Sequence, residues 1–150
     1  MSAHSSDTSA GTPVPPAAPV ARRVPAPRRD IVVAAVFDVV LVLVFVLIGR
    51  SSHSEGFSLA GTLTTWWPFL IGLAVGWAVS RAWRRPFGIR LPGLSIWLLT
   101  VLVGMLLRTV SSQGVEVSFV IVATIVIGVF LLGWRAIAAA VAARRPRPRS

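Results

Sequence analysis

The chain has 150 residues, of which 55% are apolar and 13% are charged, against about 25% charged residues in an ordinary soluble domain. Cysteine is absent, which excludes disulfides, thiolate metal sites and thiol catalysis. The net charge is +10, and all 15 basic residues are arginine. Most of these arginines flank long apolar runs, so we interpret them as membrane-topology signals and contacts to anionic lipid.

The two ends of the chain differ in composition from its middle. Residues 1–29 are rich in proline, alanine, serine and threonine. This composition cannot bury a core, so we expect a disordered cytoplasmic tail there. Residues 137–150 are basic and end in a proline-broken segment, and we expect a second cytoplasmic tail. Alternatively, residues 135–143 continue the helix formed by the apolar run that precedes them, residues 117–134.

Four apolar runs fill the domain between the tails, residues 30–136. The first run, residues 31–49, is interrupted only by Asp38 and reaches about 28 Å as a helix, close to the thickness of a bilayer's hydrocarbon core. The other runs are residues 63–80, 91–107 and 117–134. We therefore predict an all-α integral membrane bundle of four transmembrane helices. Pro68 is expected in the first turn of the second helix, where a missing N–H costs little.

The arginine positions predict the orientation of the helices. Four arginines precede the first run, four lie in the loop at residues 81–90, and five follow the last run. The two remaining loops have only Arg50 and Arg108, both at helix ends. The positive-inside rule therefore places both termini and the middle loop in the cytoplasm. Arginine usage without lysine, together with abundant alanine, valine and proline, favours a GC-rich bacterial genome, so we expect a bacterial plasma membrane.

A weak internal repeat relates the two halves of the chain. Arg50 and Arg108 are each followed six residues later by a glycine, and the next run ends in Gly-Trp at residues 76–77 and 133–134. Both hairpins start on the same side of the membrane, so the two repeats would be parallel. Short Ser/Gly loops and Gly-Trp pairs are common in membrane proteins, and the pattern is therefore only weak support for two hairpin repeats.

Small residues recur at helical spacing along the predicted helices. In lipid, such residues let helix backbones approach closely, and this approach drives association. We predict that one such stripe, at Gly72 and Gly76, is buried against another helix. The residues assigned to helix packing are Gly72, Gly76, Gly104 and Gly128.

Asp38 is the sharpest single candidate for function. It lies about 12 Å above the inner edge of the membrane by helical rise, where a charge costs roughly 2.5–3.5 kcal/mol even on the insertion scale. Arg108 lies about 13 Å higher and Arg135 about 12 Å lower. We therefore expect a hydroxyl at similar depth, Thr100, or water as its partner. Asp38, facing the bundle interior, is either a protonatable or ligand-binding group, or a neutral residue hydrogen-bonded between helices.

A second candidate site lies at the outer face, where Arg50, His53 and Arg108 are expected to gather. Such a cluster could bind an anion, while the simpler reading is that the arginines anchor helix ends by snorkelling. On the inner side we expect anionic lipid head groups at a set of four arginines. These are Arg81, Arg84, Arg85 and Arg135.

The chain has no complete catalytic, metal or nucleotide motif. One buried Asp without a neighbouring nucleophile or metal cluster does not make a catalytic constellation. The arginine-rich loop lacks the interleaved aromatic residues of a nucleic-acid platform. We therefore expect no enzyme activity, no cofactor, no metal site and no nucleic-acid partner.

A set of short patterns lies across about residues 30–136. It comprises Asp38, Gly49-Arg50 with His53, Trp67-Pro68-Phe69 with Gly72, Gly76-Trp77, Trp83-Arg84-Arg85-Pro86, Trp97, Thr100, Gly104-Met105, Arg108, Gly114 and Leu132-Gly133-Trp134-Arg135. Together these patterns resemble a prokaryotic membrane-protein family catalogued as domain of unknown function 3054. The resemblance implies a four-span membrane protein, and it supplies no activity, substrate or catalytic residue.

Two classes of function fit these features. The first is a small accessory or structural membrane component that works by helix packing, alone, as a homo-oligomer or with another membrane subunit. The alternative is a small transporter or channel-like protein that uses Asp38 in the membrane. A water-accessible cavity reaching Asp38 would favour transport, and a dry packed centre would favour the accessory class.

Overall fold

The computed structural model of the protein describes residues 26–51 and 58–144. In these two ranges all regular structure is helical, which confirms the all-α prediction. The four long helices are α1 (Arg28–Ser51), α2 (Leu59–Ser80), α3 (Leu94–Val110) and α4 (Val117–Arg144). A 3₁₀ turn at Ala82–Arg84 and a π-helical turn at Ile89–Gly93 lie between α2 and α3. With the π-helical turn added to α3, four helical segments are long and apolar enough to cross a membrane.

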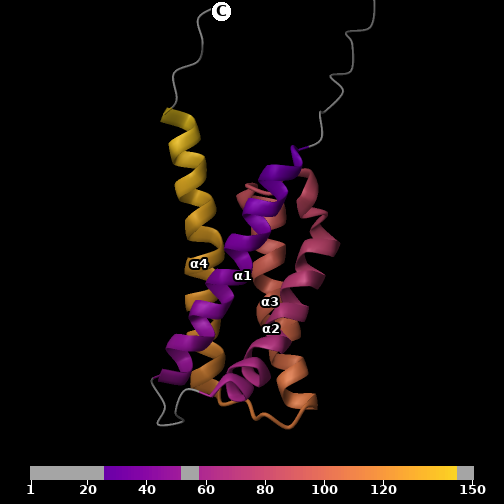
Figure 1. Cartoon of the computed structure of the whole chain (residues 1–150), viewed down its shortest axis with the longest axis vertical. Coiled ribbons are helices and arrows are strands. Elements are labelled where there is room, and N and C mark those ends of the chain that lie inside the picture. Colours follow the sequence, from indigo (N-terminus) through magenta and orange to yellow (C-terminus); the bar gives the residue numbers. More distant parts are fainter. Residues whose placement is uncertain (1–25, 52–57, 145–150) are drawn as a thin grey trace, which may run out of the picture.

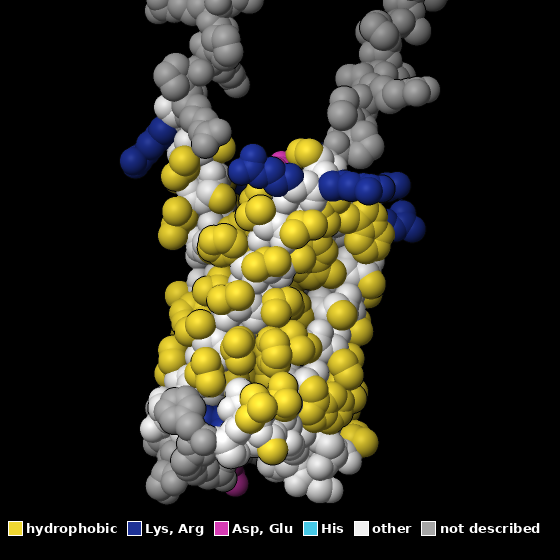
Figure 2. All heavy atoms as spheres, in the orientation of Figure 1, with side chains coloured by type: hydrophobic (Ala, Val, Ile, Leu, Met, Phe, Trp, Pro, Cys, Tyr) yellow, Lys and Arg dark blue, Asp and Glu magenta, His cyan; other side chains and the backbone are white. Residues whose placement is uncertain are grey.

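The helices run alternately up and down the bundle, as Figure 1 shows. The first described residues of α1, the α2–α3 connection and the last turns of α4 all lie at one end, which we call the terminal end. Most arginine side chains visible in Figure 2 gather at this end, above a broad apolar belt. This distribution is the one that the positive-inside rule associates with a cytoplasmic face; the assignment of that face to the cytoplasm stays a prediction.

All four helices extend beyond their predicted bounds, and the extensions of α2 and α4 change earlier expectations. α2 begins at Leu59 because the side chain of Ser58 caps it, its hydroxyl accepting a hydrogen bond from the N–H of Gly61 at 3.1 Å. Pro68 therefore lies in the helix interior, and the prediction that it occupies the first turn is wrong. α4 continues as far as Arg144, so residues 137–144 of the expected C-terminal tail are helical. The rest of that tail and nearly all of the expected N-terminal one lie outside the described residues.

Two glycines set the distance between α2 and α3. A Cβ atom added to Gly72 would lie 2.7 Å from the carbonyl oxygen of Thr100, and one added to Gly76 would lie 2.7 Å from the Cα of Ile96. Both neighbours are backbone atoms of α3, which cannot move aside as a flexible side chain can. Only glycine permits this separation, and α2 and α3 share the largest interface between elements of the bundle.

Two further glycines accept aromatic rings from a neighbouring helix. A Cβ at Gly104 of α3 would lie 2.6 Å from the ring of Phe69 on α2, and a Cβ at Gly128 of α4 would lie 2.8 Å from the indole nitrogen of Trp97 on α3. Trp97 also donates a hydrogen bond to the carbonyl oxygen of Thr124 at 2.9 Å. All four glycines assigned to helix packing are thus buried at contacts between helices.

Candidate functional site

A buried ion pair joins the first and last helices. The carboxylate of Asp38, on α1, receives two hydrogen bonds from the guanidinium of Arg135, on α4. Arg135 Nη1 lies 2.8 Å from Asp38 Oδ1, and Arg135 Nη2 lies 2.7 Å from Asp38 Oδ2. Both side chains are 0% exposed. This fork-to-fork geometry is the strongest form of an Arg–carboxylate contact.

Two tryptophans complete the environment of the carboxylate. The indole N–H of Trp77, on α2, donates to Asp38 Oδ2 at 2.8 Å, and that of Trp134, on α4, donates to Asp38 Oδ1 at 2.9 Å. Each carboxylate oxygen therefore accepts one bond from Arg135 and one from an indole. Such a fully bonded carboxylate avoids the large cost of burying an unpaired charge.

Arg135 is held from three other directions as well. Its Nη1 also donates to the carbonyl oxygen of Leu131, one turn earlier on α4, at 2.8 Å. Its Nε donates to the carbonyl oxygen of Pro86, in the α2–α3 connection, at 3.3 Å. The guanidinium carbon lies 4.6 Å from the ring centroid of Trp134, within the range of a cation–π contact. The network thus fastens α1, α2, α4 and the terminal-end connection to one another.

The expected partner of Asp38 is wrong. The hydroxyl of Thr100 is buried but donates to the carbonyl oxygen of Ile96 in its own helix, at 2.7 Å, while Arg135 occupies the position beside Asp38. The expectation failed because it placed Arg135 at the membrane edge, where the fourth apolar run ends. Asp38 is ten residues from the start of α1 and Arg135 is nine from the end of α4, so both lie about 14–15 Å from the terminal end by helical rise.

The same observation corrects the set of four arginines that were expected to contact anionic lipid. Arg135 was expected to contact anionic lipid head groups, and its complete burial excludes that role. Arg81, Arg84 and Arg85 are exposed at the terminal end, in the α2–α3 connection, where such contacts are sterically open. The basic side chains of this region therefore divide into one internal ion-pair partner and a group of surface charges.

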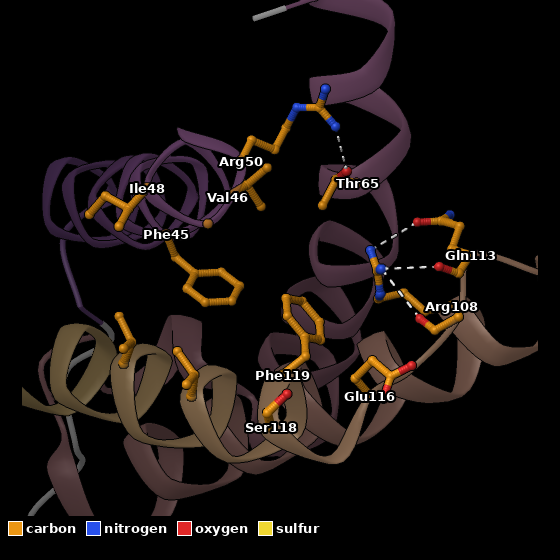
Figure 3. A pocket seen from close by; sticks show the side chains of 14 residues that line it. Phe45, Val46, Ile48, Arg50, Thr65, Arg108, Gln113, Glu116, Ser118 and Phe119 are labelled. Carbon is orange, nitrogen blue, oxygen red and sulfur yellow. Dashed lines mark hydrogen bonds between the residues drawn. The ribbon is translucent and has the colours of Figure 1, made fainter. Parts of the chain in front are cut away.

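Arg50 and Arg108 lie in a groove at the opposite end of the bundle. Arg50, in the last turn of α1, donates from Nη1 to the hydroxyl of Thr65 at 3.4 Å. Arg108, near the end of α3, donates from Nη1 to the side-chain oxygen of Gln113 at 3.0 Å and lies 4.7 Å from the ring centroid of Phe119. Both arginines line one cavity of about 670 Å³, shown in Figure 3. His53, the third member of the predicted cluster, lies outside the described residues.

Sequence reasoning missed the role of the two tryptophans. Both had been noted as the second residue of a Gly-Trp pair in the internal repeat, but they were not connected to Asp38. A useful signal was present, because a buried carboxylate needs N–H donors and an indole donates without adding charge. Their equivalent places in the two halves were a further signal, because equivalent places in parallel repeats lie at similar depths.

The fold and this network define a four-helix membrane protein closed around an internal ion pair. The family described as Protein of unknown function (DUF3054) matches residues 35–138, well over half of the chain. The chain belongs to this family, which confirms the resemblance found in the sequence. No curated protein and no solved structure matches the chain.

Proposed function

We propose that the protein is a small, non-catalytic accessory or structural component of the bacterial plasma membrane, with both termini in the cytoplasm. The observation that carries the proposal is the closure of the Asp38 site. Both members of the ion pair are 0% exposed, and each oxygen of Asp38 already accepts two hydrogen bonds. A dry, fully bonded acid supports a role in holding helices together.

The same closure weighs against the alternative, a transporter that uses Asp38. A transported proton or cation must reach the carboxylate and compete with the guanidinium, which is bound in a bidentate geometry at 2.7 and 2.8 Å. Displacing it would leave an arginine charge buried without its partner, which is strongly unfavourable. Transport through this residue would therefore need a second conformation in which the pair is open.

The surface supports membrane anchoring at the terminal end. Arg81, Arg84 and Arg85 are exposed next to apolar side chains such as Trp83 and Phe87. Tryptophan and arginine at the edge of an apolar belt favour the membrane–water interface and anionic head groups. We therefore include anionic lipid as a partner at this end, together with a second copy or another membrane subunit on the apolar belt.

Proton flux into reconstituted vesicles tests the proposal. Vesicles with the wild-type protein should conduct protons no faster than protein-free vesicles under an imposed pH gradient and membrane potential. A protonophore added at the end of each run provides the positive control. A wild-type conductance that disappears in a folded Asp38→Leu/Arg135→Met double variant would refute the structural role and support transport.

A further inference from the structure

The groove at the end of the bundle opposite the terminal end has the size of a ligand site. Its cavity of about 670 Å³ falls within the roughly 300–1,000 Å³ typical of small-molecule sites. α1 and α4 form two of its walls, and Thr65 of α2 and Arg108 of α3 contribute to its polar part. The groove is separate from the ion pair, whose residues do not line it.

The depth of the groove matches one leaflet of a bilayer. Its lining on α4 extends from Ser118 to Val126, which is about 12 Å along the helix. The hydrocarbon core of a bilayer is about 30 Å thick, so this lining lies within one half of it. An occupant that fits this depth belongs to a single leaflet.

Apolar side chains form most of the groove walls. Phe45, Val46 and Ile48 line it from α1, and Phe119, Val122 and Val126 line it from α4. Figure 3 shows the rings of Phe45 and Phe119 pointing into the space between these helices. Ile48 is 51% exposed and Val122 is 52% exposed, so the groove is open at its side, where lipid chains surround the protein.

Positive charge lies where the groove reaches the membrane surface. The guanidinium groups of Arg50 and Arg108 carry permanent charge, and hydrogen bonds to Thr65 and Gln113 hold them at the rim. Glu116 is the one carboxylate among the described lining residues. Among the described lining residues, two guanidinium groups and one carboxylate thus lie beside a deep apolar wall.

We propose that this groove binds one anionic phospholipid from the leaflet opposite the terminal end. The phosphate lies at the rim near Arg50 and Arg108, and an acyl chain lies between α1 and α4 against Phe45 and Phe119. Charge at the head and apolar contact along the chain select this amphiphile over a neutral lipid or a small polar anion. The proposal goes beyond the accessory role and does not depend on it.

A transmembrane helix from a partner fits the groove less well. A helix would need to continue through the second leaflet, where these lining residues do not reach.

Native mass spectrometry of the full chain, released from mild detergent, tests the lipid site. Titration with phosphatidylglycerol should give one adduct that saturates first, with an affinity about tenfold above that for phosphatidylcholine. Val126→Trp fills the groove from α4 and should abolish this adduct. Ile125→Trp is the matched control, because Ile125 is 59% exposed and does not line the groove.

Charge and chain contributions are separated by two further measurements. Arg50→Gln/Arg108→Gln should remove the preference for phosphatidylglycerol over phosphatidylcholine, while circular dichroism checks that the helices remain. Inorganic phosphate should not displace the bound lipid, because it lacks the chain. Equal lipid binding by Val126→Trp and Ile125→Trp, an unchanged preference in the arginine variant, or displacement by phosphate would each overturn the proposal.

Discussion

Trp77 and Trp134 donate to opposite oxygens of one carboxylate, at 2.8 and 2.9 Å from Asp38. Each tryptophan follows a glycine, Trp77 at three residues and Trp134 at ten residues before the end of its helix, and the two belong to the second helix of successive hairpins. The weak repeat in the sequence thus corresponds to a structural function, because each half supplies one donor to the same acid. Asp38 and Arg135 add the charges, and neither has a like residue at the equivalent place in the other half.

The first prediction concerns these two donors. Trp77→Phe and Trp134→Phe each keep an aromatic ring but leave one bond to a buried carboxylate oxygen unmade. We expect each to lower the free energy of unfolding by about 1–3 kcal/mol. Thermal unfolding in mild detergent, followed by circular dichroism, measures the change. Trp83→Phe is the control, because that side chain is 44% exposed and its replacement should have little effect.

The second prediction concerns the ion pair itself. Asp38→Asn leaves the buried guanidinium of Arg135 without a counter-charge, so we expect a loss of about 3–5 kcal/mol. The double variant Asp38→Leu/Arg135→Met removes both charges and should recover much of that stability. Denaturant titration of the double variant and of its two components, Asp38→Leu and Arg135→Met, gives the coupling free energy. Additive losses would show that the pair contributes little.

The helices were predictable because the bilayer imposes their length and their composition. In a bilayer, the backbone polar groups of four apolar runs of this length can be hydrogen-bonded only if each run forms a spanning helix. The arginines indicated which ends of these helices lie together. The burial of the small-residue stripe at Gly72 and Gly76 was predictable for the same reason. In lipid, glycine favours helix association because it lets two backbones approach closely. These features depend on local sequence and on the solvent.

The partner of Asp38 was not predictable by the same reasoning. The depth of a residue was estimated from the edge of its apolar run, but α4 continues through alanine-rich residues to Arg144. Alanine is apolar and a strong helix former, so the end of a run of large residues did not mark the end of the helix. The start of α2 was mispredicted in a related way. Pro68 was expected in the first turn, but the helix begins at Leu59, after the Ser58 cap.

The third prediction concerns the α2–α3 contact. Gly76→Ala would place a Cβ 2.7 Å from the Cα of Ile96, forcing the two backbones apart, and should cost about 1–3 kcal/mol as overpacking does. Gly133→Ala is the matched control, because no atom lies within 4 Å of the added Cβ. It should be neutral or slightly stabilising, since alanine favours the helix. Equal stability of the two variants in thermal unfolding would contradict the close backbone contact.

The last prediction is the orientation of the bundle, which the absence of cysteine makes directly measurable. Single cysteines at Arg84 and Ala143 lie at the terminal end, and one at Ser111 lies at the opposite end; all three positions are exposed. Because the exposed arginines gather at the terminal end, the positive-inside rule places that end in the cytoplasm. A membrane-impermeant maleimide added to intact bacterial spheroplasts should therefore label Ser111→Cys and should label Arg84→Cys and Ala143→Cys only after lysis. Labelling of Arg84→Cys before lysis would show that the bundle has the opposite orientation. The proposed lipid groove would then face the cytoplasmic leaflet.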